Sequence, residues 1–233
     1  MIDMFPRLTH KVSPEKQLAQ KKLLVRTFNL ELDKNNCRNC GVCYNVCPVD
    51  AITKGAPGAS IKNKNGDRIM SGVVLHPDSC SYCGTCSYLC PFDALHLVID
   101  GEKVPDDELQ LVEKGALPKL VKKEVELKEG KKGIQYMEGH LEYAKEACES
   151  GCRTCINICP TGALSFKKPE NPWERESFVI DRDTCIYCGA CAFSCPTGAI
   201  KIFREKINHE GKYTDPFWPN IVNKLIDFHG REK

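Results

Sequence analysis

The sequence has no apolar run approaching the roughly 18 residues that a membrane-spanning helix needs, so it predicts no transmembrane segment. The N-terminal stretch MIDMFPRLTHKVSPEKQ also lacks an apolar run of signal-peptide length, which argues against export by that route and predicts a cytoplasmic location. Charge is nearly balanced, because 33 Lys and Arg residues stand against 31 Asp and Glu residues. That balance gives no indication of a nucleic-acid partner.

Cysteine, in contrast, is abundant, with 16 in 233 residues. All of these cysteines fall in four phrases, and none is left over. Three phrases read C-x2-C-x2-C-x3-C-P, at 37–48, 80–91 and 185–196, whereas the phrase at 148–160, CESGCRTCINICP, has one more residue in its first gap. A disulfide framework would need an oxidising compartment, and structural zinc sites usually join two separated ligand pairs, so both fit this spacing poorly.

The spacing C-x2-C-x2-C-x3-C-P is the bacterial ferredoxin signature for [4Fe–4S] clusters. Three thiolates so close together can bind three corners of one cubane, and the fourth cysteine binds the other cluster of a two-cluster unit. Pairing neighbouring phrases therefore predicts four [4Fe–4S] clusters, with iron held by all sixteen cysteines. The predicted ligands are Cys37, Cys40, Cys43 and Cys90 for cluster I; Cys80, Cys83, Cys86 and Cys47 for cluster II; Cys148, Cys152, Cys155 and Cys195 for cluster III; and Cys185, Cys188, Cys191 and Cys159 for cluster IV.

The residue after the second cysteine is glycine in three phrases and arginine in the fourth. Glycine at this position lets the loop adopt backbone angles that other residues avoid. Arg153 adds a cation instead, and a fixed positive charge favours the more negative, reduced state of a cluster, so we expect a raised potential for cluster III. The alternative is that Arg153 points into water or pairs with Glu149, which would remove the effect.

The internal repeat extends beyond the cysteines, since NLELDKNNC at 29–37 matches HLEYAKEAC at 140–148, and FPRL at 5–8 matches LPKL at 117–120. This duplication predicts an α+β fold of two tandem ferredoxin-like dicluster modules, with short antiparallel strands, short helices and extended arms. The first module is predicted at 1–112, with its core at 29–100 and an N-terminal arm. The second is predicted at 113–233, with its core at 139–205, a preceding arm and a C-terminal docking tail.

Local patterns add several expected elements. Short alternating runs predict strands at 94–99, 177–180 and 199–203 in small antiparallel pairs. The Asn-Gly pair within 62–70 predicts a hairpin, and 105–118 predicts a short linker helix capped by Asp106 or Asp107. The tail at 212–233 carries a helix-like apolar series that packs either on a partner or on its own module. That series is Phe217, Trp218, Ile221, Leu225 and Phe228.

The sequence resembles the polyferredoxins of anaerobic archaea and bacteria, and among them the polyferredoxin that belongs to formylmethanofuran dehydrogenase. The resemblance rests on the cysteine phrases, on the FPRL and LPKL segments before them, and on the DAL and GAL sequences that follow the phrases at 80–91 and 148–160. The resemblance implies an electron-transfer subunit that connects the catalytic subunits of a larger redox complex to an electron-input subunit or to a soluble ferredoxin. It implies no catalysis by this chain itself.

Two other functions remain open at the level of sequence. The chain could be a free ferredoxin-type carrier, although such carriers commonly use acidic surfaces for steering and this chain is nearly neutral. It could also be a radical SAM type enzyme, because Cys148, Cys152 and Cys155 have the C-x3-C-x2-C spacing of that class. Against this second alternative, Cys195 is available as a fourth ligand, and Cys159 and Pro160 continue the ferredoxin pattern.

Overall fold

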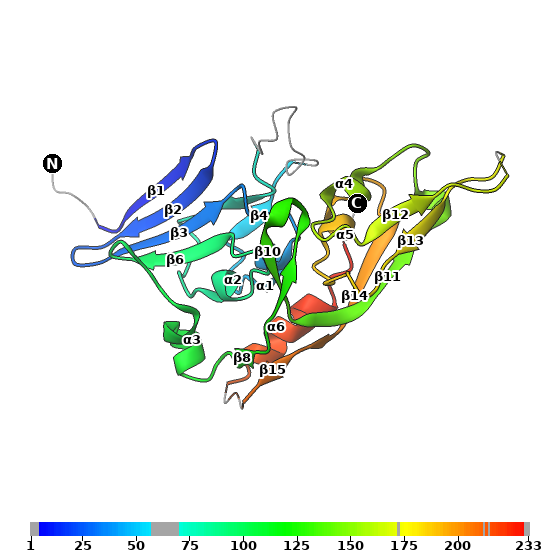
Figure 1. The fold of residues 1–233 in the computed structure, drawn as a ribbon. Coiled ribbons are helices and arrows are strands. Elements are labelled where there is room, and N and C mark those ends of the chain that lie inside the picture. The colour runs from blue at the N-terminus through cyan, green and yellow to red at the C-terminus, as the bar shows by residue number, and fades with distance from the viewer. Residues whose placement is uncertain (1–4, 57–69, 172, 212, 214, 231–233) are drawn as a thin grey trace.

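The computed structural model describes residues 5–56, 70–171, 173–211, 213 and 215–230, which form two lobes side by side (Figure 1). The predicted hairpin at 62–70 lies, apart from residue 70, outside the described residues. Within the described residues, no helix is long and apolar enough to cross a membrane.

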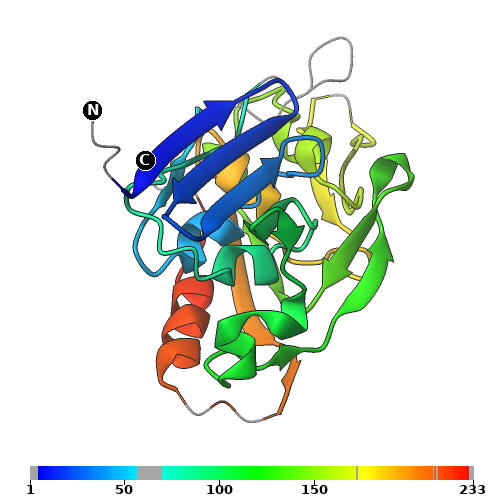
Figure 2. The same ribbon diagram turned by 90° about the vertical axis from the view of Figure 1, so that its left-hand side faces the viewer.

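The first lobe is built on a five-stranded antiparallel sheet with the order β1-β2-β3-β6-β7. Its strands are β1 (Arg7–Val12), β2 (Lys16–Lys22), β3 (Thr27–Asp33), β6 (Leu95–Ile99) and β7 (Glu102–Lys103). A separate pair joins β4 (Ile52–Lys54) to β5 (Val73–Leu75), and the helices are α1 (Val42–Val46) and α2 (Thr85–Tyr88). The predicted N-terminal arm, which precedes the core at 29–100, contains strands β1 and β2 and the start of β3. In Figure 2 the blue strands β1 to β3 face the viewer.

The second lobe repeats the core of the first. Strand β11 (Met137–Tyr143) pairs with β14 (Ile200–Ile207) as β3 pairs with β6, and β12 (Leu164–Lys167) pairs with β13 (Ser177–Ile180) as β4 pairs with β5. The helices α4 (Thr154–Ile158) and α5 (Ala190–Ser194) correspond to α1 and α2. All three predicted strands are present, as β6, β13 and β14. However, β6 lies in the five-stranded sheet rather than in a small pair.

The linker between the lobes differs from its prediction. Instead of one capped helix at 105–118, a 3-10 helix (Asp106–Glu108) is followed by α3 (Gln110–Glu113), and neither has a side-chain cap. The carboxylate of Asp106 pairs with Lys122 instead, and the extended backbone of Leu109, at φ −64° and ψ 127°, interrupts the helix. The predicted cap at Asp106 or Asp107 is therefore wrong.

Beyond α3, short elements of the linker run across both lobes. Strand β8 (Lys119–Leu120) pairs with β15 (His209–Glu210), and β9 (Lys123–Glu126) pairs with β10 (Lys132–Gln135). A 3-10 turn at Lys128–Gly130 joins β9 to β10, and a further 3-10 turn at Lys145–Ala147 follows β11 in the second lobe. The backbone N–H of Ile134 donates to the carbonyl of Pro91 in the first lobe, and that of Lys128 donates to Pro160 in the second.

The C-terminal helix α6 (Phe217–Ile226) packs against both lobes, through α1 on one side and β14 on the other (Figure 1). Its apolar face, formed by Trp218, Ile221 and Leu225, is fully buried in the chain itself. The apolar series of the tail is thus used to join the lobes, and the larger hydrophobic core contains residues from both of them.

Candidate iron–sulfur site

Three of the four cysteine loops enter their helix through a glycine in the left-handed conformation. Gly41, Gly84 and Gly189 precede α1, α2 and α5 with φ of 78°, 79° and 89°. A side chain is disfavoured there by roughly 1–2 kcal/mol. At Gly41 a Cβ atom would also lie 2.5 Å from Cδ2 of Phe193 in α5, so this loop touches the second lobe directly.

The fourth loop enters its helix with a different backbone conformation. Arg153, which stands where the other loops have glycine, has φ −125° and needs no left-handed conformation. The residue before the second cysteine is left-handed in all four loops: Gly151 has φ 81°, and Asn39, Tyr82 and Tyr187 have φ 53°, 54° and 52°. The fourth loop therefore has ordinary backbone at Arg153 where the other three have a left-handed glycine, and it still leads from Cys152 into α4.

Two cavities show how cysteines from different phrases come together. One is lined by Cys37, Cys40, Cys43 and Cys90. The other is lined by Cys159, Cys185, Cys188 and Cys191. Each cavity combines three cysteines of one phrase with the fourth cysteine of the neighbouring phrase. These are the sets predicted for clusters I and IV.

The other two sets are visible in the electrostatics of the thiols. Burial raises the pKa of Cys86 well above its ordinary value, and the neighbouring Cys83, Cys80 and Cys47, followed by Cys90 of the cluster I set, raise it further. Burial likewise raises the pKa of Cys155 to about 11. A backbone N–H opposes that shift, while Cys152, Cys195 and Cys148 add to it. In both cases the interacting thiols include the fourth cysteine of the neighbouring phrase, as clusters II and III require.

The donor set suits an iron–sulfur cluster. None of the sixteen cysteines is in a disulfide, and several sulfurs accept backbone hydrogen bonds, from Ala51 to Cys47 at 3.2 Å and from Ala94 to Cys90 at 3.3 Å. Such donors stabilise the negative charge of a ligating thiolate and tune a cluster's potential. Among the described residues no group of three or more His, Cys, Asp or Glu side chains could hold a single metal ion. A cubane needs no such convergence, because each thiolate binds a different iron atom.

Arg153 has a partner that the sequence did not indicate. Its guanidinium forms an ion pair with Glu176, the residue before β13, and lies 4.4 Å from the ring centre of Phe166. The side chain therefore takes a carboxylate other than Glu149, and it does not point freely into water. Since a carboxylate compensates the cation, the reason for expecting a raised potential at cluster III is removed.

Two buried polar residues beside the cysteine loops were missed from sequence. Arg204 on β14 is 1% exposed, and Tyr136 in the linker is also 1% exposed and donates its hydroxyl to the carbonyl of Leu89. The alternation along β14 could have indicated that Arg204 is buried, because Ile200, Ile202 and Arg204 occupy the same inward face. Tyr136 carried no comparable signal.

The 4Fe-4S dicluster domain family matches residues 36–94 and 147–199, and a second family of the same description matches residues 72–160. NADH-quinone oxidoreductase subunit I of Pelobacter propionicus is 32% identical over 80 residues, which are 32% of this chain and 42% of that protein. The iron-sulfur subunit of the nitrate-inducible formate dehydrogenase of Escherichia coli is 34% identical over 73 residues, which are 31% of this chain and 24% of that protein. The chain thus spans less than half the length of these curated relatives.

A solved structure covers almost the whole chain. It is a chain of the formate dehydrogenase, heterodisulfide reductase and formylmethanofuran dehydrogenase complex from Methanospirillum hungatei, with a TM-score of 0.79 and 25% identity. The alignment includes 99% of this chain and 95% of that one. The two matches to the first family each contain eight of the sixteen cysteines, and the chain therefore belongs to the ferredoxin-type 4Fe-4S dicluster family, with two such domains and four [4Fe–4S] clusters.

Proposed function

We propose that this chain is a non-catalytic electron-transfer subunit, whose four low-potential clusters relay electrons to or from the catalytic subunits of a larger redox complex. The observation that carries the proposal is that all sixteen cysteines lie in four ferredoxin-type phrases, and that two cavities are each lined by four of these cysteines. The chain's own residues supply thiolate ligands, backbone N–H donors to sulfur, and apolar walls that exclude water. When bound, the clusters supply reversible one-electron chemistry.

The ligand sets of the proposal are the crossed sets predicted from the sequence. The two cavities support clusters I and IV, and the mutual influence of the thiols supports clusters II and III. The proposal keeps the two modules at 1–112 and 113–233, each with its pair of clusters. A cytoplasmic, anaerobic setting remains part of the same proposal.

For the parent complex we infer one of the formylmethanofuran dehydrogenase type. Two observations support this choice: the likeness of the arms and phrases to that enzyme's polyferredoxin, and the solved complex that includes formylmethanofuran dehydrogenase and aligns with 99% of this chain. The partners would then be the catalytic and electron-input subunits, with a soluble ferredoxin as a further electron donor or acceptor.

The test begins with the full chain purified without oxygen. We expect four [4Fe–4S] clusters, which is sixteen iron and sixteen acid-labile sulfide per chain, together with electron exchange with viologen dyes. Stoichiometric zinc or stable disulfides would contradict the proposal. Binding of S-adenosylmethionine, or turnover of an organic substrate by the pure chain, would favour the radical SAM alternative, and purification from the native host without attached subunits would favour a free carrier.

A further inference from the structure

The loops of clusters I and IV face each other where the two lobes meet. A Cβ atom at Gly189 in the second lobe would lie 3.5 Å from the carbonyl oxygen of Cys40 in the first. From the other side, the Gly41 backbone packs against the ring of Phe193. A side chain at Gly41 would prevent its contact with Phe193, whereas at Gly189 a Cβ would first meet Nη2 of Arg204, at 2.7 Å.

The electrostatics show the same proximity. Burial raises the pKa of Cys40 well above its ordinary value, and among the neighbouring thiols Cys188 of the second lobe contributes more than Cys90 or Cys37. Cys90 and Cys37 belong to the same cluster set as Cys40. The thiol with the largest influence on Cys40 thus lies across the lobe junction, in the set of cluster IV.

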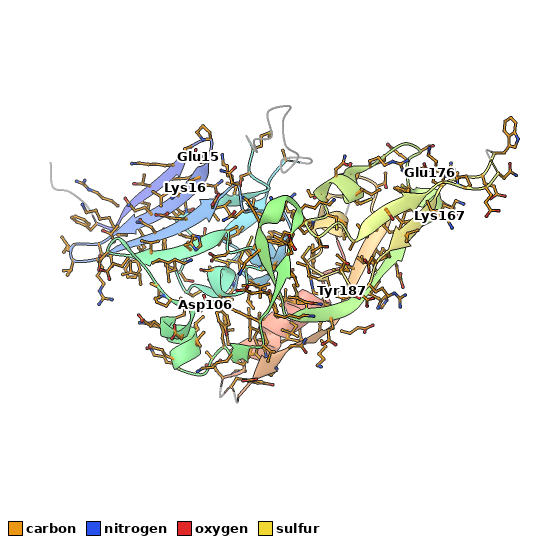
Figure 3. All side chains as sticks on the ribbon, in the orientation of Figure 1. Glu15, Lys16, Asp106, Lys167, Glu176 and Tyr187 are labelled. Atoms are coloured by element: carbon orange, nitrogen blue, oxygen red, sulfur yellow. The ribbon has the colours of Figure 1, made fainter. Side chains whose placement is uncertain are left out.

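The Arg204 guanidinium is buried at this junction. It donates from Nη2 to the carbonyl of Cys188 at 2.6 Å, from Nε to that of Tyr187 at 3.2 Å, and from Nη1 to that of Leu225 at 3.1 Å. Figure 3 labels Tyr187 near the middle of the molecule, between the two lobes. A single side chain thus connects the loop of cluster IV with the end of α6.

No carboxylate of the described residues forms an ion pair with Arg204, in contrast to Arg153 and its partner Glu176. Carbonyl groups satisfy its N–H donors but leave its charge uncompensated. A buried charge is costly unless an opposite charge lies nearby. Burial lowers the pKa of the Arg204 guanidinium, and this shift is opposed by Cys40, Tyr136, Cys188 and Cys191, whose thiols come from the sets of both cluster I and cluster IV.

We propose that Arg204 is a positioning residue that holds the cluster IV loop at the lobe junction and raises the reduction potentials of clusters I and IV together. This proposal rests on the proposed function. It makes I and IV the inner pair and places II and III at the two ends. Reduction adds one electron and one negative charge to a cluster, and a nearby cation that water does not screen favours that state.

The principal test is Arg204→Met in the full chain, with the four potentials followed by EPR during a dithionite redox titration. We expect the reduction equilibrium constants of two centres to fall at least tenfold, about 59 mV for one electron, while the other two stay unchanged. Cys40→Ser and Cys188→Ser identify the centres, because each alters the spectrum of one cluster. Arg204→Lys keeps the charge, so its four potentials should lie close to those of the wild-type chain.

Lys206→Met is the matched control, since Lys206 lies two residues away on the same strand but is mostly exposed and next to Glu138. It should move no centre. If Arg204→Met does not retain its clusters, Arg204→Gln gives the same comparison while keeping an amide donor for the carbonyls.

The outcomes separate this inference from the proposed function. Four unmoved centres in the Arg204 variants, or equal shifts in all four centres, would overturn the inference and leave the electron-transfer function intact. A wild-type chain that binds no clusters would overturn the proposed function itself.

Discussion

Replacing Gly41 by alanine would measure how closely the two lobes are held together. The residue has φ 78°, where a side chain costs roughly 1–2 kcal/mol. The new methyl group would also lie 2.5 Å from the Phe193 ring, and overpacking of this kind typically costs about 1–3 kcal/mol. We therefore expect Gly41→Ala to lower the free energy of unfolding by about 2–5 kcal/mol.

Gly151→Ala is the matched control. Gly151 also lies in a cysteine loop and has φ 81°, but no described atom lies within 4 Å of the added Cβ. Only the backbone term of roughly 1–2 kcal/mol remains. The free energies of unfolding of the two variants should therefore differ by about 1–3 kcal/mol. In a chain of this size each kcal/mol lowers the melting temperature by about 2–4 °C.

The assay is the loss of the clusters' visible absorbance on heating without oxygen, at one fixed rate because such unfolding is often irreversible. A second variant, Gly41→Ala with Phe193→Leu, removes the ring that the methyl group meets and should recover part of the loss. Equal midpoints for Gly41→Ala and Gly151→Ala would refute the tight contact between the lobes.

Further predictions concern the ligands, the odd loop and the iron. Cys47→Ser should change the same EPR centre as Cys83→Ser, because both belong to the cluster II set, and a match with Cys40→Ser would show that the crossed assignment is wrong. Arg153→Gly should lower the potential of cluster III because it leaves the Glu176 carboxylate unpaired, and Glu176→Gln should raise it, whereas the double variant should leave it nearly unchanged; a clear downward shift in the double variant would contradict the pairing. Chelation of iron should unfold both modules, since the clusters fill their interiors, and an unchanged far-ultraviolet circular dichroism spectrum would refute this.

The cysteine spacing was enough to predict the duplicated core, because ligand geometry restricts a cluster loop far more than secondary-structure propensity restricts a helix. The strands at 95–99 and 177–180 followed from alternation, which reports burial on one face. The five-stranded sheet did not follow, because its extra strands pair through backbone groups that a sequence does not distinguish. The linker cap failed for a related reason: Asp106 could equally pair with a lysine sixteen residues away.

The meeting of the two lobes was the hardest part to predict. The apolar series on α6 was recognised, but its partner could not be, because an amphipathic helix buries the same face against a second protein or against its own chain. Arg204 shows the same limit. Its alternation with Ile200 and Ile202 indicates an inward side chain, yet only the fold shows that this position faces two cysteine loops.

The placement of α6 has a consequence for the timing of assembly. The carbonyl of Cys47 accepts a hydrogen bond from Lys224 at 2.9 Å, and Asn45 donates to the carbonyl of the same lysine, so the first module is held by residues synthesised 177 positions later. At about 5–20 residues per second, ribosomes need on the order of 10–40 s to cover that interval. Until then α1 has no covering helix and its cysteine loop is open to solvent. Clusters inserted into the first module during synthesis would therefore lack the contacts that α6 makes with this module, and we expect their stable incorporation to follow translation of α6.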